Sequence, residues 1–589
     1  MNMKKNLIYI VSLILVAFSL SSCEGFLNRP AEDTYNRDNF YQTDEQCIQG
    51  VNYLYNSPWF DVIRGFYRVG ECFSGNYYMG SSPYLQFTVN GSDKELRDMS
   101  ASLWAVNSHA ATVYNRTKDA DISPAVKNMV MGEALVWKAY AYFFLVRSFG
   151  EVPIIHDISK AIADGNYNDL YKAPKEDVYN YVVMLLDKAM ELLPKKVANK
   201  DGRIDYYSAE ALLAKVYLQK AGVTGTLNQA DLDKAAGYAK DVIENSGRML
   251  LENYSDVFRL QNNKNIECLV SWHWDASAQP WTAQNAFQSD LAMNGFDEFG
   301  DCWGQWNGPS IALQDQFGVS ATQDPSQRSD VDTRRKATMM LAGDVYDYFW
   351  SAQGGFDYIR FFYDDNYGPS GSSNASDKSM NSPTGAGCVK FLYGDGTDHM
   401  AALGVSAGRM AYGLSTHILR LSDVYLVYCE SKLHGPGSST SDPLALDVFF
   451  RVRKRAIPTL TETPASITFE QVWKERNLEL ALEGDRWYDY VRVGYYNPDF
   501  VVSDIQGQRR NNFNSGSNTT SLNDVYKAYY ETGVWNATGI NYNVDEFPVP
   551  GRDAILNKVA ALPFPSEDVV YNPHLEDPAQ PFDFETIEF

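Results

Sequence analysis

The chain has 589 residues, with 74 Asp and Glu against 51 Lys and Arg, and a formal net charge of −23 at pH 7. A surface this acidic repels phosphate backbones, which excludes nucleic acid as an expected partner. Aromatic residues make up 14% of the chain and include 39 Tyr. We therefore expect exposed phenol and indole groups, which suit ligands with apolar faces and many hydroxyls.

The first 22 residues resemble a bacterial lipoprotein signal peptide that is cleaved before Cys23. Lys4 and Lys5 precede an apolar run over 7–20, and two serines come directly before the cysteine. The run is shorter than the roughly 20 apolar residues that a membrane-spanning helix needs. Acylation of Cys23 would attach several lipid chains, and two or more chains anchor a protein stably. The sequence predicts a lipid-anchored protein, with an ordinary secretory signal as the alternative.

The other cysteines form no C-x-x-C pair and have no His at metal-ligand spacing: Cys47, Cys72, Cys268, Cys302, Cys388 and Cys429. The sequence therefore predicts no metal and no cofactor, although an exported chain could pair some of these cysteines. Cys429 lies in an apolar helical pattern and is expected to be a core residue. The acidic stretch 364–366 lacks the spacing of a calcium loop and is expected to be a solvated turn.

Four helices are expected in the first half of the chain, over 129–149, 178–193, 208–221 and 231–245. Apolar residues recur at helical spacing in each. The second helix follows Pro174 and three charged residues, 175–177, that place acids in its first turn, and it ends before a further proline.

An internal echo supports a repeat of helical pairs. Glu133-Ala134-Leu135 with Lys138 and Tyr140 recurs 77 residues later as Glu210-Ala211-Leu212 with Lys215 and Tyr217. Two helical hairpins of a tetratricopeptide-like repeat, at about 34 residues each plus loops, would give this interval. Chance similarity between two Ala-rich helices is the alternative.

A third helical pair is expected over 418–433 and 444–456, followed by a helix over 469–483. Between the helical regions, 250–415 is rich in Gly, Asp, Asn, Ser and Trp, with short strand-like runs, and its stretch 368–387 is expected to be a loop. The predicted fold is mainly α, a tetratricopeptide-like scaffold of helical pairs with a large irregular, loop-rich subdomain that contains short strands.

Four ordered motifs resemble those of the SusD/RagB family of outer-membrane nutrient-binding lipoproteins. They are GEALVWKAYAYFFLVRSFGEVP at 132–153, LRLSDVYL at 419–426, ERNLELALEGDRWYDYVR at 475–492, and LPFP at 562–565 with NP at 572–573. Phe564 stands where an aliphatic residue is more usual in the family. Directly after the predicted lipidation site, Glu24 is the only acid before Gly25-Phe26-Leu27, whereas family members at the cell surface often carry several acids there.

The resemblance implies one SusD-like domain over 23–589. Its helical scaffold would lie mainly in 127–249 and 416–493, and its loop-rich, ligand-binding subdomain mainly in 250–415 and 494–589. In the family, the helical face docks on a SusC-like TonB-dependent transporter and the loop-rich face captures oligosaccharide.

Five of the twelve tryptophans fall within 35 residues: Trp272, Trp274, Trp281, Trp303 and Trp306. The first two alternate on a predicted strand and share one face, where core packing is favoured over a stacking platform. Trp281, Trp303 and Trp306 lie among Gly, Asn, Asp and Pro. There an indole face could pack on a sugar ring, while Asp301 and Asn307 bond hydroxyls.

Two further candidates for ligand contact are weaker. The stretch 76–84 holds three phenols, among them Tyr78 and Tyr84, with a packed turn as an equal alternative. Arg360 could act as a fork-like donor to hydroxyls, although an Arg on a strand between aromatics is more often a partnered structural residue.

No catalytic residues are predicted. The G-x-S-x-G at 404–408 lacks the preceding strand and following helix of a nucleophile elbow. Ion pairs at i,i+3 are possible among Glu483, Arg486, Asp489 and Arg492. This spacing favours a structural role in the scaffold over catalysis. Arg147 and Arg420 are likewise expected to satisfy buried carbonyls or carboxylates.

The resemblance and the loop tryptophans together predict a non-catalytic glycan-binding lipoprotein of the outer membrane, exposed at the cell surface, that captures ligand and delivers it to a SusC-like transporter. A surface glycoside hydrolase is one alternative, because a carboxylate pair at glycosidase separation is not readable from sequence. A binder of peptides or other nutrients on the same scaffold is the other.

Overall fold

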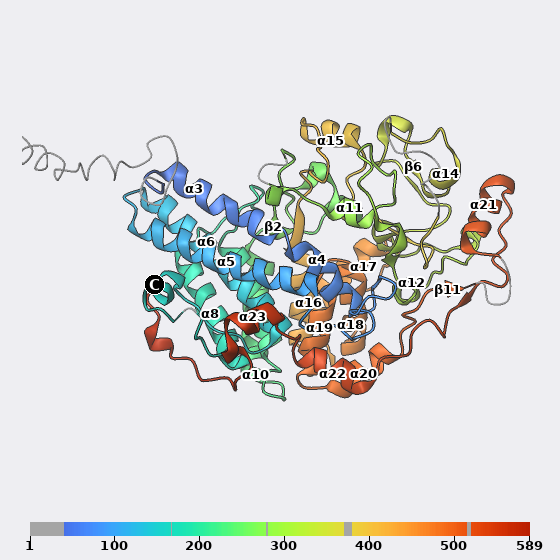
Figure 1. The fold of residues 1–589 in the computed structure, drawn as a ribbon. Helices are drawn as coiled ribbons and strands as arrows, with labels where there is room; N and C mark the ends of the chain where they lie inside the picture. The colour runs from blue at the N-terminus through green and yellow to red at the C-terminus, as the bar shows by residue number, and fades with distance from the viewer. Residues whose placement is uncertain (1–39, 167, 278–280, 370–379, 515–519) are drawn as a thin grey trace, which may run out of the picture.

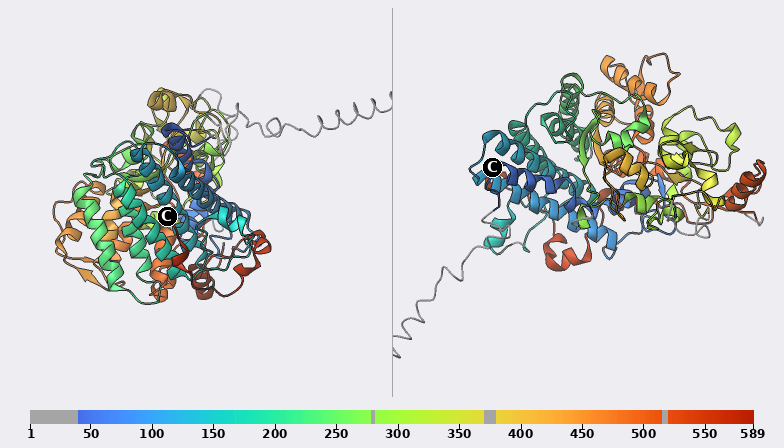
Figure 2. Two further views of the ribbon diagram at one scale, coloured as in Figure 1. Left: turned by 90° about the vertical axis from the view of Figure 1, so that its left-hand side faces the viewer. Right: turned by 90° about the horizontal axis from the view of Figure 1, so that it is seen from above.

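The computed structural model describes residues 40–166, 168–277, 281–369, 380–514 and 520–589. The predicted signal peptide and Cys23 lie outside these residues, as does the middle of the predicted loop 368–387. The described chain forms an elongated molecule, with long helices gathered at one end and short elements joined by loops at the other (Figures 1 and 2).

Five long helices follow one another in the first half of the chain: α5 (Lys94–Asp119), α6 (Pro124–Phe149), α8 (Lys175–Leu192), α9 (Tyr206–Lys220) and α10 (Gln229–Asn245). Each packs along the next in the series. The expected mainly α fold of paired helices is confirmed. Helix α5 was not predicted, although its buried residues, which include Leu96, Met99, Leu103 and Val106, recur at helical spacing.

Helix α6 is apolar around its whole circumference, and it alone among the described helices is long and apolar enough to cross a membrane by composition. Its most apolar 18-residue window is 94% buried within the protein. Neighbouring helices cover all its faces, so α6 is the central helix of the core.

The second helical group follows the loop-rich region and packs on α9 and α10 through α16 (Leu421–Ser431). It continues with α17 (Pro443–Ala456), α18 (Phe469–Leu480) and α19 (Arg486–Gly494). The prediction of a helix from residue 418 was wrong at its start.

Residues Thr416–Arg420 form strand β8, which pairs antiparallel with β2 (Cys268–Trp272). The run alternates β-branched and other side chains, and the helix begins only after Arg420, whose backbone is extended. Trp272 and Trp274 are both buried beside this pair, with ring centroids 6.0 Å apart, so the core interpretation of these two tryptophans is confirmed.

The remaining elements are short. The helices are α3 (Asp44–Asn52), α4 (Val62–Tyr67), α7 (Ile158–Ala163), α11 (Phe287–Leu291), α12 (Ile311–Phe317), α13 (Arg334–Thr338), α14 (Tyr358–Tyr363), α15 (Gly396–Leu403), α20 (Pro498–Gln506), α21 (Leu522–Thr532), α22 (Arg552–Ala560) and α23 (Ser566–Tyr571). The antiparallel two-residue strand pairs are β1 (Tyr77–Tyr78) with β3 (Gly308–Pro309), β4 (Met339–Met340) with β7 (Gly387–Cys388), β5 (Val345–Tyr346) with β6 (Phe356–Asp357), β9 (Ser439–Thr440) with β10 (Ile467–Thr468), and β11 (Phe513–Asn514) with β12 (Asn541–Tyr542).

The last hundred residues do not all lie with the loop-rich region. Helix α21 packs on α14 there, whereas α20 and α22 pack on α19 of the scaffold. Phe564 stacks on Phe149 at the end of α6, and Phe589 contacts His156. Only the middle of 494–589 therefore joins the loop-rich region, and the division into subdomains stays a prediction.

Buried ion pairs join the two regions. Glu479 of α18 accepts from Arg334 at 3.0 Å, from Arg420 at 2.6 Å, and from Arg455. Although burial alone would raise the pKa of Glu479, the three guanidinium groups lower it far below its usual range. Arg334 comes from α13 of the loop-rich region and Arg455 from α17, so one carboxylate holds both regions.

The i,i+3 pairs predicted among Glu483, Arg486, Asp489 and Arg492 are present in part. Asp489 accepts from Arg486 at 3.2 Å and from Arg492 at 2.6 Å. Glu483 instead pairs with Arg420 and with Lys390, each at 2.8 Å. The chain reverses between α18 and α19, with φ of +64° at Leu482 and +75° at Gly484, so Glu483 lies on no common helix with the others. Arg147 bonds Asp485 at 2.7 Å, as expected of a structural Arg.

Glu479→Gln should destabilise the fold by about 3–5 kcal/mol, because it leaves buried arginines without their shared counter-charge. Urea unfolding followed by circular dichroism measures this. The control is Glu531→Gln, whose exposed carboxylate lies 4.0 Å from Lys527 one helical turn away and should cost less than about 0.5 kcal/mol. Equal unfolding midpoints for the two variants would contradict the structural role of the network.

Candidate functional site

Three tryptophans of the loop-rich region are exposed. Trp281 has 57% of its surface exposed, Trp303 43% and Trp306 58%. Trp281 begins the 3₁₀ turn η6 (Trp281–Ala283), and the other two flank and end the turn η7 (Gly304–Trp306). Trp side chains are on average highly buried, so three exposed indoles in one region mark a candidate binding surface.

Trp281 and Trp303 are each linked to the segment at the start of helix α4, Trp281 through Phe60 and Trp303 through Asp290. Trp281 makes an edge contact with Phe60, with ring centroids 6.4 Å apart, and Arg64 follows one helical turn after Phe60. The Trp303 indole N–H donates to Asp290 at 2.8 Å. Burial raises the pKa of Asp290, while this hydrogen bond and the nearby Arg64 lower it. The name α4 strip is used below for these five residues together: Trp281, Phe60, Arg64, Asp290 and Trp303.

The backbone that carries Trp303 and Trp306 is held close to α11. The Trp303 N–H donates to the Ser289 carbonyl at 2.9 Å, and the Gly304 N–H to the Ala292 carbonyl at 2.8 Å. A Cβ at Gly304 would lie 2.4 Å from the carbonyl carbon of Leu291, so only glycine permits this approach. The indoles of Trp303 and Trp306 therefore project from a fixed turn, which we name the tryptophan loop. A fixed turn limits the entropy lost when a ligand binds.

The two polar residues predicted beside these indoles differ in position. Asn307 is partly exposed directly after Trp306. Asp301 is 1% exposed, and its carboxylate accepts the Met410 N–H at 2.8 Å beneath the loop. Only Asn307 of the two is accessible for contact with a ligand on this surface.

The predicted tyrosine candidates are packed. Tyr78 and Tyr84 are 2% and 1% exposed. Tyr84 donates to Asp93 at 2.6 Å, and Tyr78 donates to Glu546. The stretch lies beside the tryptophan loop through the β1–β3 pair, but its hydroxyls are engaged inside the protein. The stretch 76–84 is therefore the packed turn that was the alternative to ligand contact.

Arg360 is exposed on α14, not on a strand. It pairs with Asp364 at 2.8 Å and stacks on Tyr367 at 4.1 Å. Tyr358 and Phe362 of the same helix line a small pocket with Asn307. Because Arg360 is two residues from each, it lies on the other face of α14, and the structure does not bring it together with the indoles.

A buried acidic group supports the tryptophan loop from below. Asp297, Asp301 and Cys302 place their ligand atoms within 4.8 Å of one another, a spacing at which a metal ion could be held. The Cys302 thiol donates to Asp297 at 3.2 Å. Burial, followed by the charge of Asp297, raises the pKa of Asp301 from 3.8 to about 6. No standard motif in the sequence pointed to this cluster.

Asp301→Asn should stabilise the protein above pH 6. A raised folded pKa means that the wild-type carboxyl stabilises the fold fully below about pH 4 and loses this contribution as pH rises to about 6. The amide cannot ionise, so the melting temperature of the variant should gain about 2 °C on wild type across this interval, measured by scanning calorimetry from pH 4 to 8. A difference that does not change with pH would contradict the assignment, and a loss of stability restored only by added divalent metal would point to a metal ligand.

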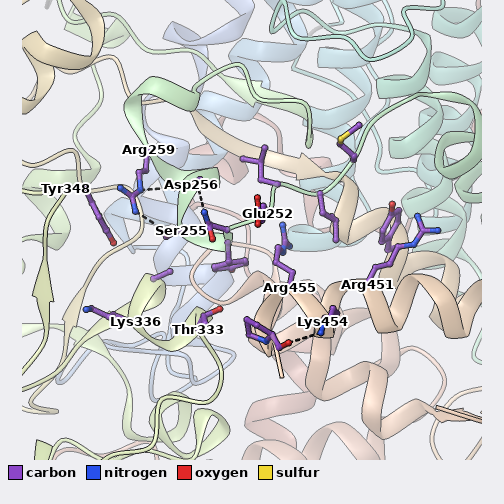
Figure 3. A pocket seen from close by; sticks show the side chains of 18 of the residues that line it. Glu252, Ser255, Asp256, Arg259, Thr333, Lys336, Tyr348, Arg451, Lys454 and Arg455 are labelled. Atoms are coloured by element: carbon purple, nitrogen blue, oxygen red, sulfur yellow. Dashed lines mark hydrogen bonds and ion pairs between the residues drawn. The ribbon is translucent and has the colours of Figure 1, made fainter. Parts of the chain in front are cut away.

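The sequence missed a large cavity. It has a volume of about 800 Å³ and lies between α17 and the turn η4 (Tyr254–Phe258) (Figure 3). A neighbouring cavity of about 300 Å³ shares Arg259 and Tyr348 with it. The lining residues come from separate segments spread over more than 200 positions, so no local pattern could reveal the cavity.

The G-x-S-x-G stretch 404–408 follows helix α15 instead of preceding a helix, and Ser406 is exposed. The nearby His399 binds the Val405 carbonyl at 2.8 Å and accepts the Gly413 N–H at 3.0 Å. Both ring nitrogens are engaged by backbone, so the geometry of a nucleophile elbow is absent here.

Comparisons with known proteins agree over nearly the whole chain. Residues 222–578 match the family model described as SusD family, and residues 96–218 match one described as starch-binding associating with outer membrane. A SusD-like protein of Bacteroides ovatus is 30% identical over 598 residues, which cover 99% of each chain.

Solved structures show the same fold. A crystal structure with xylogluco-oligosaccharide is 28% identical, with a TM-score of 0.73, covering 91% of this chain and 99% of that one. A laminarin binding SusD-like protein is 20% identical, with a TM-score of 0.57, covering 82% and 96%.

Proposed function

We propose, because this chain belongs to the SusD family, that it is a non-catalytic, cell-surface lipoprotein that binds oligosaccharides or polysaccharides through Trp281, Trp303 and Trp306. The observation that carries the proposal is the exposure of these three indoles, two of which, Trp303 and Trp306, lie at a turn that is fixed by backbone hydrogen bonds. The family description of starch binding in association with the outer membrane agrees with it.

The α4 strip supplies what a sugar chain requires. The indole faces can pack on the apolar C–H faces of sugar rings. Arg64 of the α4 strip is partly exposed. Together with Asn307, it offers hydrogen-bond donors to hydroxyl groups. A relative of known structure holds a xylogluco-oligosaccharide, which supports a glycan ligand here without identifying it.

Binding is favoured over hydrolysis by the state of the carboxylates near the indoles. Asp290 accepts the Trp303 N–H and Asp301 is buried beneath the loop. Neither is placed as one of two carboxyl groups flanking an open glycosidic bond. A surface glycoside hydrolase therefore has less support than a binding protein.

Delivery to a SusC-like TonB-dependent transporter completes the proposal. It rests on the resemblance of the chain to its family and on the outer-membrane association of the matched family model. A lipid on Cys23 would keep the protein beside such a transporter at the membrane surface.

Substituting the tryptophans by Ala should abolish binding without unfolding the protein. A stacking residue at the centre of a site contributes on the order of 2 kcal/mol or more, so at least one of Trp281→Ala, Trp303→Ala and Trp306→Ala should weaken oligosaccharide binding at least ~30-fold. Calorimetric titration with a glycan identified by array screening measures this.

The matched control is Tyr571→Ala, since Tyr571 is 68% exposed at the end of α23 and should leave affinity unchanged. Normal binding by all three tryptophan variants would place the site elsewhere. Accumulation of reducing ends with intact protein would show that the protein is an enzyme, and preference for peptides on a matched panel would favour the other alternative.

Cys23→Ala should release the protein from membranes, because it removes the acylated thiol. Fractionation of cells that express the variant, with mass spectrometry of the processed amino terminus of wild type, tests this. Tight membrane association of the variant, or a wild-type terminus without a diacylglyceryl cysteine, would contradict the lipid anchor.

A further inference from the structure

The cavity between the helical scaffold and the loop-rich region is built like a binding cleft. Its volume of about 800 Å³ lies within the range of ligand pockets in proteins. One wall is the C-terminal part of α17, and the other is made by η4, α13 and the segment around Tyr348 (Figure 3). Tyr425, from α16, is 3% exposed and also lines the cleft.

The charged residues of this lining differ in composition from those of the chain as a whole. The chain carries a net −23, whereas the cleft is lined by more cationic than acidic side chains. The cationic residues are Arg259, Lys336, Arg451, Lys454 and Arg455, and the acidic ones are Glu252, Asp256 and Asp347.

Three of these cations already have carboxylate partners. Arg259 pairs with Asp256 at 3.3 Å, and Arg451 pairs with Asp447 at 2.6 Å outside the lining. Arg455 is 8% exposed and is neutralised by Glu267 and Glu479 of the buried network. They shape the cleft but have little charge left for a ligand.

Lys336 and Lys454 differ from them. Lys336, on α13, lies 5.3 Å from the Tyr346 ring centroid, and Lys454, on α17, donates to the carbonyls of Pro458 at 2.7 Å and Leu460 at 2.5 Å. Within the described part of the chain, neither ammonium group has a carboxylate at ion-pairing distance. Figure 3 shows the two lysines on opposite walls along one side of the cleft, with Thr333 between them.

Neutral hydrogen-bonding and aromatic groups line the rest of the cleft. The Arg259 guanidinium stacks 3.5 Å from the centre of the Tyr348 ring, and Ser255 and Asn253 supply a hydroxyl and an amide. A ligand that fits would combine hydroxyl groups with an anionic group. A lysine ammonium binds a carboxylate or a sulfate as a point charge and makes charge-assisted hydrogen bonds to either.

We propose that this cleft is a second binding site, distinct from the tryptophans, which takes an acidic saccharide whose carboxylate or sulfate pairs with Lys336 or Lys454. Glu252 and Asp347, the acids of the lining without a cationic partner at ion-pairing distance among the described residues, disfavour ligands with a high density of charge. The proposal rests on the proposed function only in taking the ligand to be a saccharide.

The test is calorimetric titration of the full mature protein with three probes. They are an oligogalacturonate, a sulfated oligosaccharide and a neutral xylogluco-oligosaccharide. At least one acidic probe should bind wild type, with affinity that falls as salt rises. The acidic probe that binds identifies carboxylate or sulfate as the recognised group.

Lys336→Ala combined with Lys454→Ala should weaken binding of the acidic probe at least ~30-fold, because each charged hydrogen bond contributes about a factor of ten or more. The Arg double variant, which keeps both charges, should retain most of the affinity. The control, Lys240→Ala with Lys527→Ala, removes two exposed lysines from other helices and should leave binding unchanged. If loss of the Lys454 contacts unfolds α17 in the double variant, binding of the acidic probe by Lys336→Ala alone tests the proposal instead.

This experiment tests the second site and the tryptophan site separately. Trp303→Ala should leave the acidic probe bound, and the lysine variants should leave any neutral probe bound. The second site is overturned if wild type binds neither acidic probe, or if the lysine and control variants bind alike. Loss of acidic binding in the tryptophan variants alone would show a single site at the α4 strip.

Discussion

The shared ion pairs of Glu479 are the constraint on which the rest of this structure depends. Arg334, Arg420 and Arg455 come from three different elements, α13, β8 and α17, yet all three bond one buried carboxylate. Since an unpaired charge in this interior would cost several kcal/mol, none of the segments can move without the others. The loop-rich region is thereby fixed on the helical scaffold although its described elements, apart from β2, are two-residue strands and short helices.

Such a fixed base explains how the tryptophan loop can present indoles to solvent. The turn at Trp303 lacks an extended sheet, but its backbone is bonded to α11 and its indole N–H to Asp290. The polar groups of the loop are therefore satisfied without burying the rings. A flat aromatic surface on a rigid loop loses little conformational entropy on binding, which is suited to ligands that offer only weak apolar faces.

The same network also shapes the electrostatics of the surface. Many arginines pair with buried acids and have little charge left for a ligand. Two lysines on facing walls of a large cleft stand out for this reason. The ion pairs of Glu479 with Arg455 of α17 and Arg334 of α13 hold the two walls of this cleft relative to each other.

The sequence alone determined the helical pairs, the family motifs and the exposed position of Trp281, Trp303 and Trp306, because helical periodicity and polar neighbours act locally. It also indicated the pairing of Asp489 with Arg486 and Arg492, whose spacing lies within one helix. Tertiary structure decided that Asp301, Tyr78 and Tyr84 are buried, that Glu483 turns toward Arg420, and that a cleft lies between Lys336 and Lys454. These outcomes depend on which distant segments meet, and burial and charge pairing between such segments leave no signal in the spacing of neighbouring residues.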